Sequence, residues 1–149
     1  MTTINAIGNS INLNAALGTD LTSSGSRIIG TANENQAFGD VVRVGASSEM
    51  YIADASVIAT SRVIAMCADA TISADADGNY LLPGGIARQN TWDWSAPGVP
   101  IYLTITGTTT NCLSESVPTE TSECVVFVGI ALTADSMLFN PDSSIVEIA

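Results

Sequence analysis

Three short segments of the chain recur in the same order about 60 residues further along, which is the signature of an internal repeat. The matched pairs are residues 39–44 with 98–103, 64–70 with 128–134, and 79–84 with 136–141. The order is kept while the loops between the segments differ in length. A chain of 149 residues has room for one domain with a proper core. The repeat therefore predicts one body made of two similar halves, at about 39–88 and 98–149.

The repeated segments and their neighbours are short apolar runs separated by turn residues. The expected strands are residues 41–44, 50–53, 62–67, 80–83, 86–89, 100–106, 111–113, 123–132, 137–140 and 145–148. Gly, Pro, Asn and Asp fill the segments between them, including Asp77-Gly78, a strong hairpin-turn pair. One or two helical turns around residues 55–61 are the only expected helix. Many short strands at close spacing predict an all-β fold, a sandwich or a small barrel, over residues 37–149.

Residues 1–36 differ in composition from the rest of the chain. They are rich in Asn, Ser, Thr, Gly and Ala, with apolar residues only in small clusters. Such a stretch cannot build a core alone, so an extended N-terminal arm is expected, with its apolar residues meant for a neighbour or for the outside of the β body. A first hairpin packed on its own domain is the competing interpretation.

The charge balance is strongly acidic. Fifteen Asp and Glu residues face four basic residues, all of them arginines, and every charged residue after Arg88 is acidic. A phosphate backbone would be repelled, so no nucleic acid is expected as a partner. The longest uncharged apolar run, residues 124–132, is too short for a membrane helix, and the N-terminus lacks the pattern of a secretory signal. We expect no membrane association and production in a cytoplasm, unless export follows a route that the sequence does not display.

The residue types that carry most enzyme chemistry are scarce. Histidine and lysine are absent, so a Ser-His-Asp or Cys-His arrangement cannot be assembled. Asp75, Asp77 and Asp93 are the closest candidates for paired carboxylates, and the first two fall in an expected turn. Residues 75–79 alternate oxygen-bearing side chains but lack the spacing of a calcium-binding EF-hand loop. No phosphate-binding glycine pattern occurs. The chain is expected to be no enzyme, with neither cofactor nor metal.

Three cysteines leave at least one thiol unpaired. Cys67 and Cys124 lie in apolar strand-like runs, where a free cysteine acts as a small buried hydrophobe. A bridge between Cys112 and Cys124 remains open, because sequence alone does not give its geometry.

Trp92 and Trp94 form the most unusual cluster. Two aromatic residues two apart on an extended segment point to the same side, and Pro97-Gly98 turns the chain just after them. One interpretation makes both rings anchors that close one end of the body or the seam between its halves. The other makes them a contact patch for a docking partner.

At these residues the sequence resembles a β domain of tailed-bacteriophage virion proteins, found in head decoration (cement) proteins and at the ends of fibre or tail proteins. The resemblance rests on Trp92-x-Trp94, on residues 97–103 and 128–132, and on residues 138–141 followed by 146–148. It covers about residues 39–149. What it implies is a virion component without enzymatic activity, commonly a homotrimer, located on the capsid surface or in an appendage.

Two roles are compatible with that resemblance. A fibre protein usually carries a long shaft before its tip, and no such shaft is visible in this sequence. A small β domain with a partly apolar arm suits a capsid decoration protein, whose partners would be the major capsid protein and its own copies. A receptor-binding tail or fibre domain is the alternative. The expected contact residues are Ile4, Ile7, Ile11, Leu13, Leu17, Trp92 and Trp94.

Overall fold

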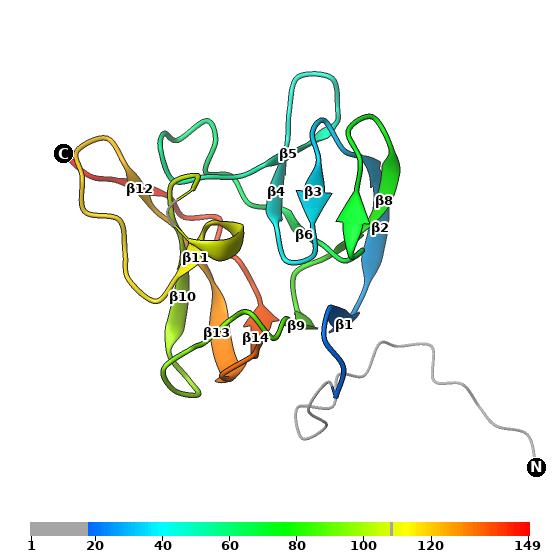
Figure 1. The fold of residues 1–149 in the computed structure, drawn as a ribbon. Helices are drawn as coiled ribbons and strands as arrows, with labels where there is room; N and C mark the ends of the chain where they lie inside the picture. Colours follow the sequence, from blue (N-terminus) through cyan, green and yellow to red (C-terminus); the bar gives the residue numbers. More distant parts are fainter. Residues whose placement is uncertain (1–17, 108) are drawn as a thin grey trace, which may run out of the picture.

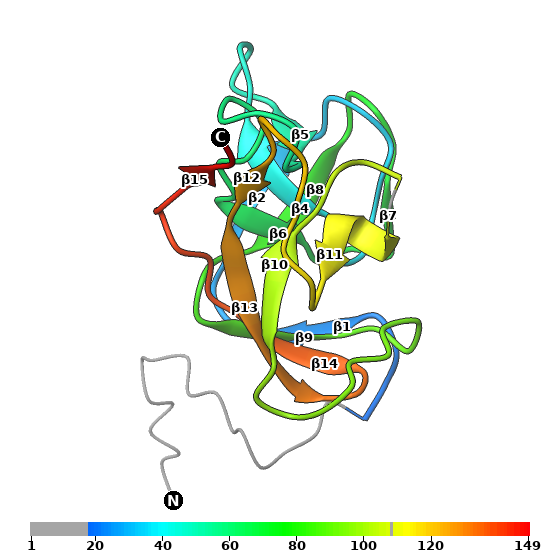
Figure 2. The same ribbon diagram turned by 90° about the vertical axis from the view of Figure 1, so that its left-hand side faces the viewer.

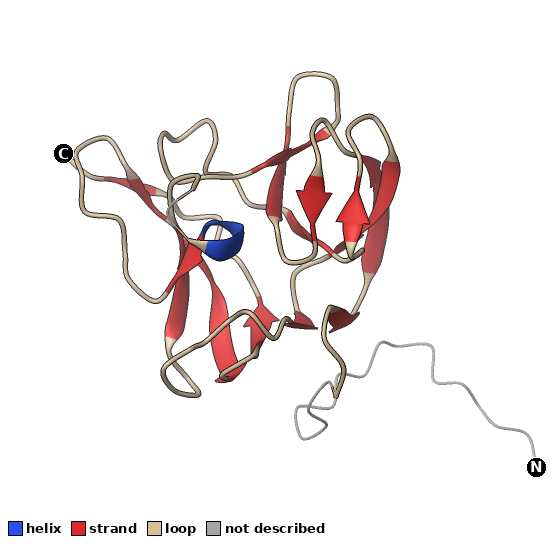
Figure 3. Cartoon of the chain, viewed as in Figure 1, coloured by secondary structure: helices blue, strands red, loops and turns tan. Residues whose placement is uncertain are grey.

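The computed structural model describes residues 18–107 and 109–149, and they form short antiparallel strands joined by turns, loops and a short 3-10 helix at Thr110–Cys112 (Figure 3). The prediction of an all-β fold is confirmed. The strands are β1 (Thr22–Ser24), β2 (Arg27–Thr31), β3 (Gln36–Ala37), β4 (Val41–Val44), β5 (Met50–Ile52), β6 (Ala65–Cys67), β7 (Thr71–Ile72), β8 (Asp77–Leu81), β9 (Gly85–Arg88), β10 (Pro100–Leu103), β11 (Leu113–Ser114), β12 (Cys124–Val125), β13 (Phe127–Thr133), β14 (Ser136–Phe139) and β15 (Val146–Glu147). Within the described ranges no helix is long and apolar enough to cross a membrane.

Two larger sheets make up most of the body (Figure 1). A six-stranded sheet has the order β1-β9-β14-β13-β10-β11, and a five-stranded sheet has the order β2-β8-β6-β4-β5. Two small ladders, β3 with β7 and β12 with β15, complete the structure. Ala32, just after β2, bridges to Met50 at the start of β5, so the five-stranded sheet curls back toward its own first strand.

The two larger sheets share one topology. In chain order, β2, β4, β5, β6 and β8 occupy the same places in the five-stranded sheet as β9, β10, β11, β13 and β14 in the other. The three pairs of segments that recur in the sequence coincide with the equivalent strands β4 and β10, β6 and β13, and β8 and β14. We call residues 27–81 the first repeat and residues 85–139 the second repeat. The expected limits of 39–88 and 98–149 therefore shift, because β9 opens the second repeat just as β2 opens the first.

The segment expected to be an arm contributes strands to the body. β1 pairs with β9, and all five residues of β2 pair with β8. An edge strand needs only one buried face and one ladder of backbone hydrogen bonds, which a segment with few apolar residues can supply. For residues 22–36 the hairpin-type interpretation is thus closer to the structure than the arm. Residues 1–17, with the remainder of the expected arm, lie outside the described residues.

Two hydrophobic cores pack on opposite faces of the five-stranded sheet. Val41 points into the main core, which lies between the two larger sheets, and Val42 points into the second core. This alternation is the period-two pattern of a strand that is buried on both faces. Within the second core, the hydroxyl of the fully buried Tyr80 donates to Gln36 Oε1 over 2.8 Å, and burial raises the pKa of Tyr80 to about 12.

Other local predictions are corrected by packing. Residues 55–61 form bends and turns, not a helix, because the Asp54 carboxylate accepts hydrogen bonds from Ser56 and Thr60 and holds the loop instead. Asp77-Gly78 lies in β8, and the turn falls at residues 74–75. Gly78 is needed because a Cβ there would lie 2.1 Å from Ile72 Cδ1.

All three cysteines are buried and free, so the bridge between Cys112 and Cys124 is absent. Burial raises the pKa of the Cys67 thiol to about 12 and also raises that of Cys112. A thiol kept protonated is a poor nucleophile and a poor metal ligand, so these thiols act as small apolar side chains.

Candidate functional site

Trp92 and Trp94 lie in the connection between β9 and β10, inside the second repeat, and both belong to the main core. They are only 3% and 8% exposed, and their ring centroids are 5.6 Å apart at a tilt of 37°. The two rings are therefore anchors in the main core, as the first interpretation expects. A partner docking on this part of the molecule would meet the polar neighbours of the tryptophans and very little of the rings themselves.

Asn111 ties this connection to the first repeat. Its side-chain oxygen accepts the indole hydrogen of Trp92, and its amide donates to the backbone oxygen of Phe38 and to Asp40 Oδ1 over 3.0 and 2.7 Å. Asn111 adopts a left-handed backbone conformation, with φ of 58°, which Asn tolerates better than most residues. Desolvation raises the pKa of Asp40, although hydrogen bonds from Ala37 and Asn111 oppose the shift. This network fastens the two repeats together.

A shallow cleft of about 430 Å³ lies over the two tryptophans. Hydroxyl and carboxylate side chains dominate its wall, including Asp93 and Glu115. Glu115 accepts a hydrogen bond from the backbone of Ser95 over 2.5 Å, which fixes one side of the cleft. Trp94 Nε1 is buried, and no described residue accepts its hydrogen. The chemistry on offer is hydrogen bonding to a polar ligand.

The face of the six-stranded sheet that points away from the main core is apolar. We call it the outer face and define it by five side chains: Ile86, Tyr102, Phe127, Ile130 and Leu138. Each alternates along its strand with residues of the main core. Ile86 is opposite Leu138, Leu138 is opposite Ile130, and Tyr102 is opposite Phe127, with the last two rings in an edge-to-face contact at 6.3 Å. A solvated antiparallel sheet face is normally polar, so this face is a candidate for binding.

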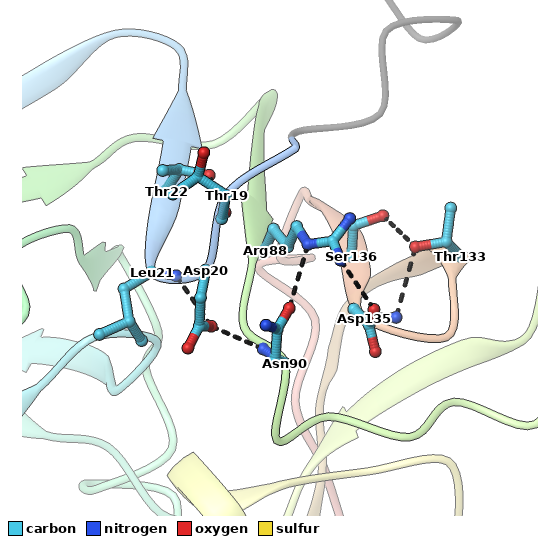
Figure 4. Close-up of polar contacts among 9 residues, drawn as sticks. All are labelled: Thr19, Asp20, Leu21, Thr22, Arg88, Asn90, Thr133, Asp135 and Ser136. Carbon is cyan, nitrogen blue, oxygen red and sulfur yellow. Dashed lines mark hydrogen bonds and ion pairs between the residues drawn. The ribbon is translucent and has the colours of Figure 1, made fainter.

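A polar cluster borders the outer face where β1, β9 and β14 meet (Figure 4). Arg88 forms an ion pair with Asp135 at 3.0 Å and donates to the Asn90 side chain at 3.2 Å. Asp20 Oδ1 accepts hydrogen bonds from the backbone amides of Leu21 and Asn90. The cluster thus fixes the point at which residues 18–22 join the six-stranded sheet.

The expected contact residues Ile4, Ile7, Ile11, Leu13 and Leu17 lie outside the described residues. The outer face was missed in the sequence because its members are scattered among four strands and are adjacent only through strand pairing. The apolar residues at alternate positions, such as Ile86 and Leu138, would have been its only signal.

The candidate acids show no shared arrangement. Asp77 accepts a hydrogen bond from Thr31 over 2.7 Å, and Asp75 occupies a turn with φ of 63°. Asp93 lines the cleft over the tryptophans. Among residues 18–107 and 109–149, no three His, Cys, Asp or Glu side chains are grouped so that they could hold a metal ion.

Comparison of the chain with protein-family models, with curated proteins and with solved structures found no match in any of the three.

Proposed function

We propose that this protein is a bacteriophage capsid decoration protein, which binds the outer surface of the head as a homotrimer and stabilises the shell without catalysing a reaction. The observation that carries the proposal is the combination of a two-repeat β body with an apolar outer sheet face next to residue 18, where the described part of the chain begins. Such a face can bind a partner, and such a body can support it mechanically. The resemblance of residues 39–149 to phage virion β domains supplies the identity of the partner, the major capsid protein.

Shell stabilisation would come from several weak contacts that act together. A trimer presents each contact three times, so the apparent affinity for a symmetric lattice exceeds that of any single contact. The acidic surface favours a basic or polar site on the shell and disfavours packaged nucleic acid. Residues 1–17 are the proposed shell contact in each protomer.

The test uses purified full-length protein and expanded capsids that lack it. The protein should sediment as a trimer, bind the capsids to saturation and raise their melting temperature. Removing residues 1–17 should abolish binding, whereas removing residues 1–36 would unfold the body, because β1, β2 and half of β3 would be lost. Capsids whose melting temperature does not change at saturating protein would contradict the proposal.

A receptor-binding tail or fibre role is the second candidate, and the cleft over the tryptophans favours it. The hydroxyls and two carboxylates of the cleft wall match the hydrogen-bonding chemistry of a glycan. In that case the protein should adsorb to host cells and block infection, and Glu115→Ala should weaken adsorption more than Glu147→Ala, which changes an exposed acid on β15. Equal adsorption by the two variants would remove the cleft from consideration.

A further inference from the structure

The outer face is the counterpart of a core face. In the first repeat, Ile28, Tyr80 and Cys67 are neighbours across three strands, and all three line the second core. The same places in the second repeat are held by Ile86, Leu138 and Ile130. The pair Val42 and Ala65 likewise corresponds to Tyr102 and Phe127. A face that lines a core in one repeat therefore belongs to no core in the other.

Part of the difference lies in the connection between β6 and β8. Residues 68–76 link β6 to β8 in the first repeat and carry Ile72, which packs over Gly78 in the second core. The corresponding link between β13 and β14 consists only of Ala134 and Asp135. Gly78 is replaced by Ser136, and the glycine opposite it, Gly30, by Arg88. The second repeat therefore lacks this cover and has the polar cluster of Figure 4 in that position.

The five positions of the outer face hold large apolar or aromatic residues, although no equivalent of residues 68–76 packs over them. Ile86 is only 4% exposed although it belongs to neither core, and Ile130 is 37% exposed at the centre of the sheet. Tyr102, Phe127 and Leu138 are half-buried. A contiguous apolar sheet face of this kind marks a place where another segment packs.

The chain enters the six-stranded sheet at the rim of this face. The Thr22 hydroxyl donates to the backbone oxygen of Thr19 over 2.6 Å, and Leu21 has φ of 52°, so residues 19–22 form a tight turn. The Asp20 carboxylate, which binds the Asn90 amide, holds this turn next to Arg88 (Figure 4). Residue 18 therefore lies beside the outer face. The path of the chain at this residue is set by the turn and not by β1.

We propose that residues 1–17 dock on the outer face of the six-stranded sheet in their own chain. Besides Met1, the segment carries five large apolar side chains, Ile4, Ile7, Ile11, Leu13 and Leu17, and it has no charged side chain. Its reach is ample: 17 extended residues span about 55 Å at roughly 3.3 Å each, while β1 and β10 are four strand spacings apart, about 19 Å. Ile86, Leu138 and Ile130 receive the segment, and the Tyr102–Phe127 pair lies beyond them on β10 and β13.

This docking needs no capsid and does not rest on the proposed function. In the free protein the segment and the face cover each other. The shell contact proposed for the same segment would then compete with the docking, so shell binding would release the outer face.

The test is made on the full-length protein by nuclear magnetic resonance and hydrogen exchange. Nuclear Overhauser contacts should join methyl groups of residues 4–17 to the rings of Tyr102 and Phe127. Amides in residues 1–17 should exchange at least 10-fold more slowly than in an unstructured peptide of the same sequence. Ile130→Lys should remove both signals. Ile29→Lys is the matched control, since Ile29 is 75% exposed on the five-stranded sheet, and it should leave both unchanged.

Three results would overturn the docking. The amides of residues 1–17 would exchange at the rate of the free peptide, the contacts would lead to another surface, or the contacts would appear only between differently labelled chains in a mixed sample. Should Ile130→Lys fail to fold, Ile130→Thr serves in its place, with a smaller expected loss of protection. Failure of capsid binding with the contacts intact would contradict only the proposed function.

Discussion

The indole of Trp92 donates its hydrogen to the side-chain oxygen of Asn111, 19 residues further along the chain, over 3.1 Å. Through the amide of Asn111 the same contact continues to Phe38 and Asp40 in the first repeat. One polar side chain in a left-handed conformation therefore links the two repeats at this place, and its contribution can be tested directly.

Asn111→Ala should lower the free energy of unfolding by about 2–3 kcal/mol, because Trp92 and Asp40 lose a buried partner and alanine is strained at positive φ. Asn111→Gly removes the same hydrogen bonds but tolerates the backbone, so its loss should be smaller. Urea unfolding followed by tryptophan fluorescence measures both. Equal losses would mean that backbone strain contributes nothing at this position.

The Asp54 carboxylate should make stability sensitive to acid. Burial acts to raise its pKa, but hydrogen bonds from Ser56, Thr60 and Thr106 outweigh burial and lower the pKa below its ordinary value of 3.8. A lowered folded-state pKa gives stabilisation that is complete above the unfolded value and is lost as the pH falls from 3.8 through the folded value.

Asp54→Asn should therefore cost about 1 kcal/mol at pH 7, where the partly exposed carboxylate is ionised, and the difference from the wild type should shrink below pH 3.8. Melting temperatures between pH 7 and pH 2 provide the measurement. Glu147→Gln is a suitable control, because that carboxylate is exposed on the short strand β15. A difference that stays constant with pH would argue against ionisation as the cause.

Gly78→Ala should destabilise the protein by about 2–3 kcal/mol through overpacking, because the new methyl group would lie 2.1 Å from Ile72. Shortening the neighbour should relieve the clash, so Ile72→Val in the same chain should recover part of the loss. A double-mutant cycle based on thermal unfolding measures the coupling between the two sites. Additive effects would show that the second core adjusts elsewhere.

The thiols should be inert in the folded protein. Burial raises the pKa of Cys67 to about 12, so almost no thiolate exists at pH 8, and Cys112 is shifted in the same direction. A thiol-specific reagent should detect no fast-reacting cysteine in native protein and all three in denaturant. A native mass lowered by two hydrogens would instead indicate a disulfide.

Much of the architecture can be predicted from the sequence, since each recurring segment contains a strand whose equivalent lies in the other repeat. A turn glycine lies two positions before the first residue of each of the equivalent strands β4 and β10. Both glycines adopt positive φ, 89° at Gly39 and 88° at Gly98. Such local signals survive because turn geometry and strand spacing depend on neighbours in the chain.

Membership of a sheet is not a local property. From the sequence, the residues of β9 are expected to end the first half. In the structure β9 pairs with β14 and is the first strand of the second repeat. In the sequence, Trp92 and Trp94 are compatible with anchors and with a contact patch, and only tertiary packing shows that both rings are buried. The outer face depends on the register of four strands, so no window of sequence contains it.

The short link at Ala134 and Asp135 has a consequence for how such a chain can change over time. After a gene segment is doubled, one copy can keep its full set of connections and so guarantee solubility and folding. The other copy can lose a connection, together with a short strand such as β7, and gain an exposed apolar face while the five equivalent strands of its sheet keep their places. Loop length, more than side-chain chemistry, is then the variable on which selection can act, and a graft of residues 68–76 into the second repeat would reverse the step.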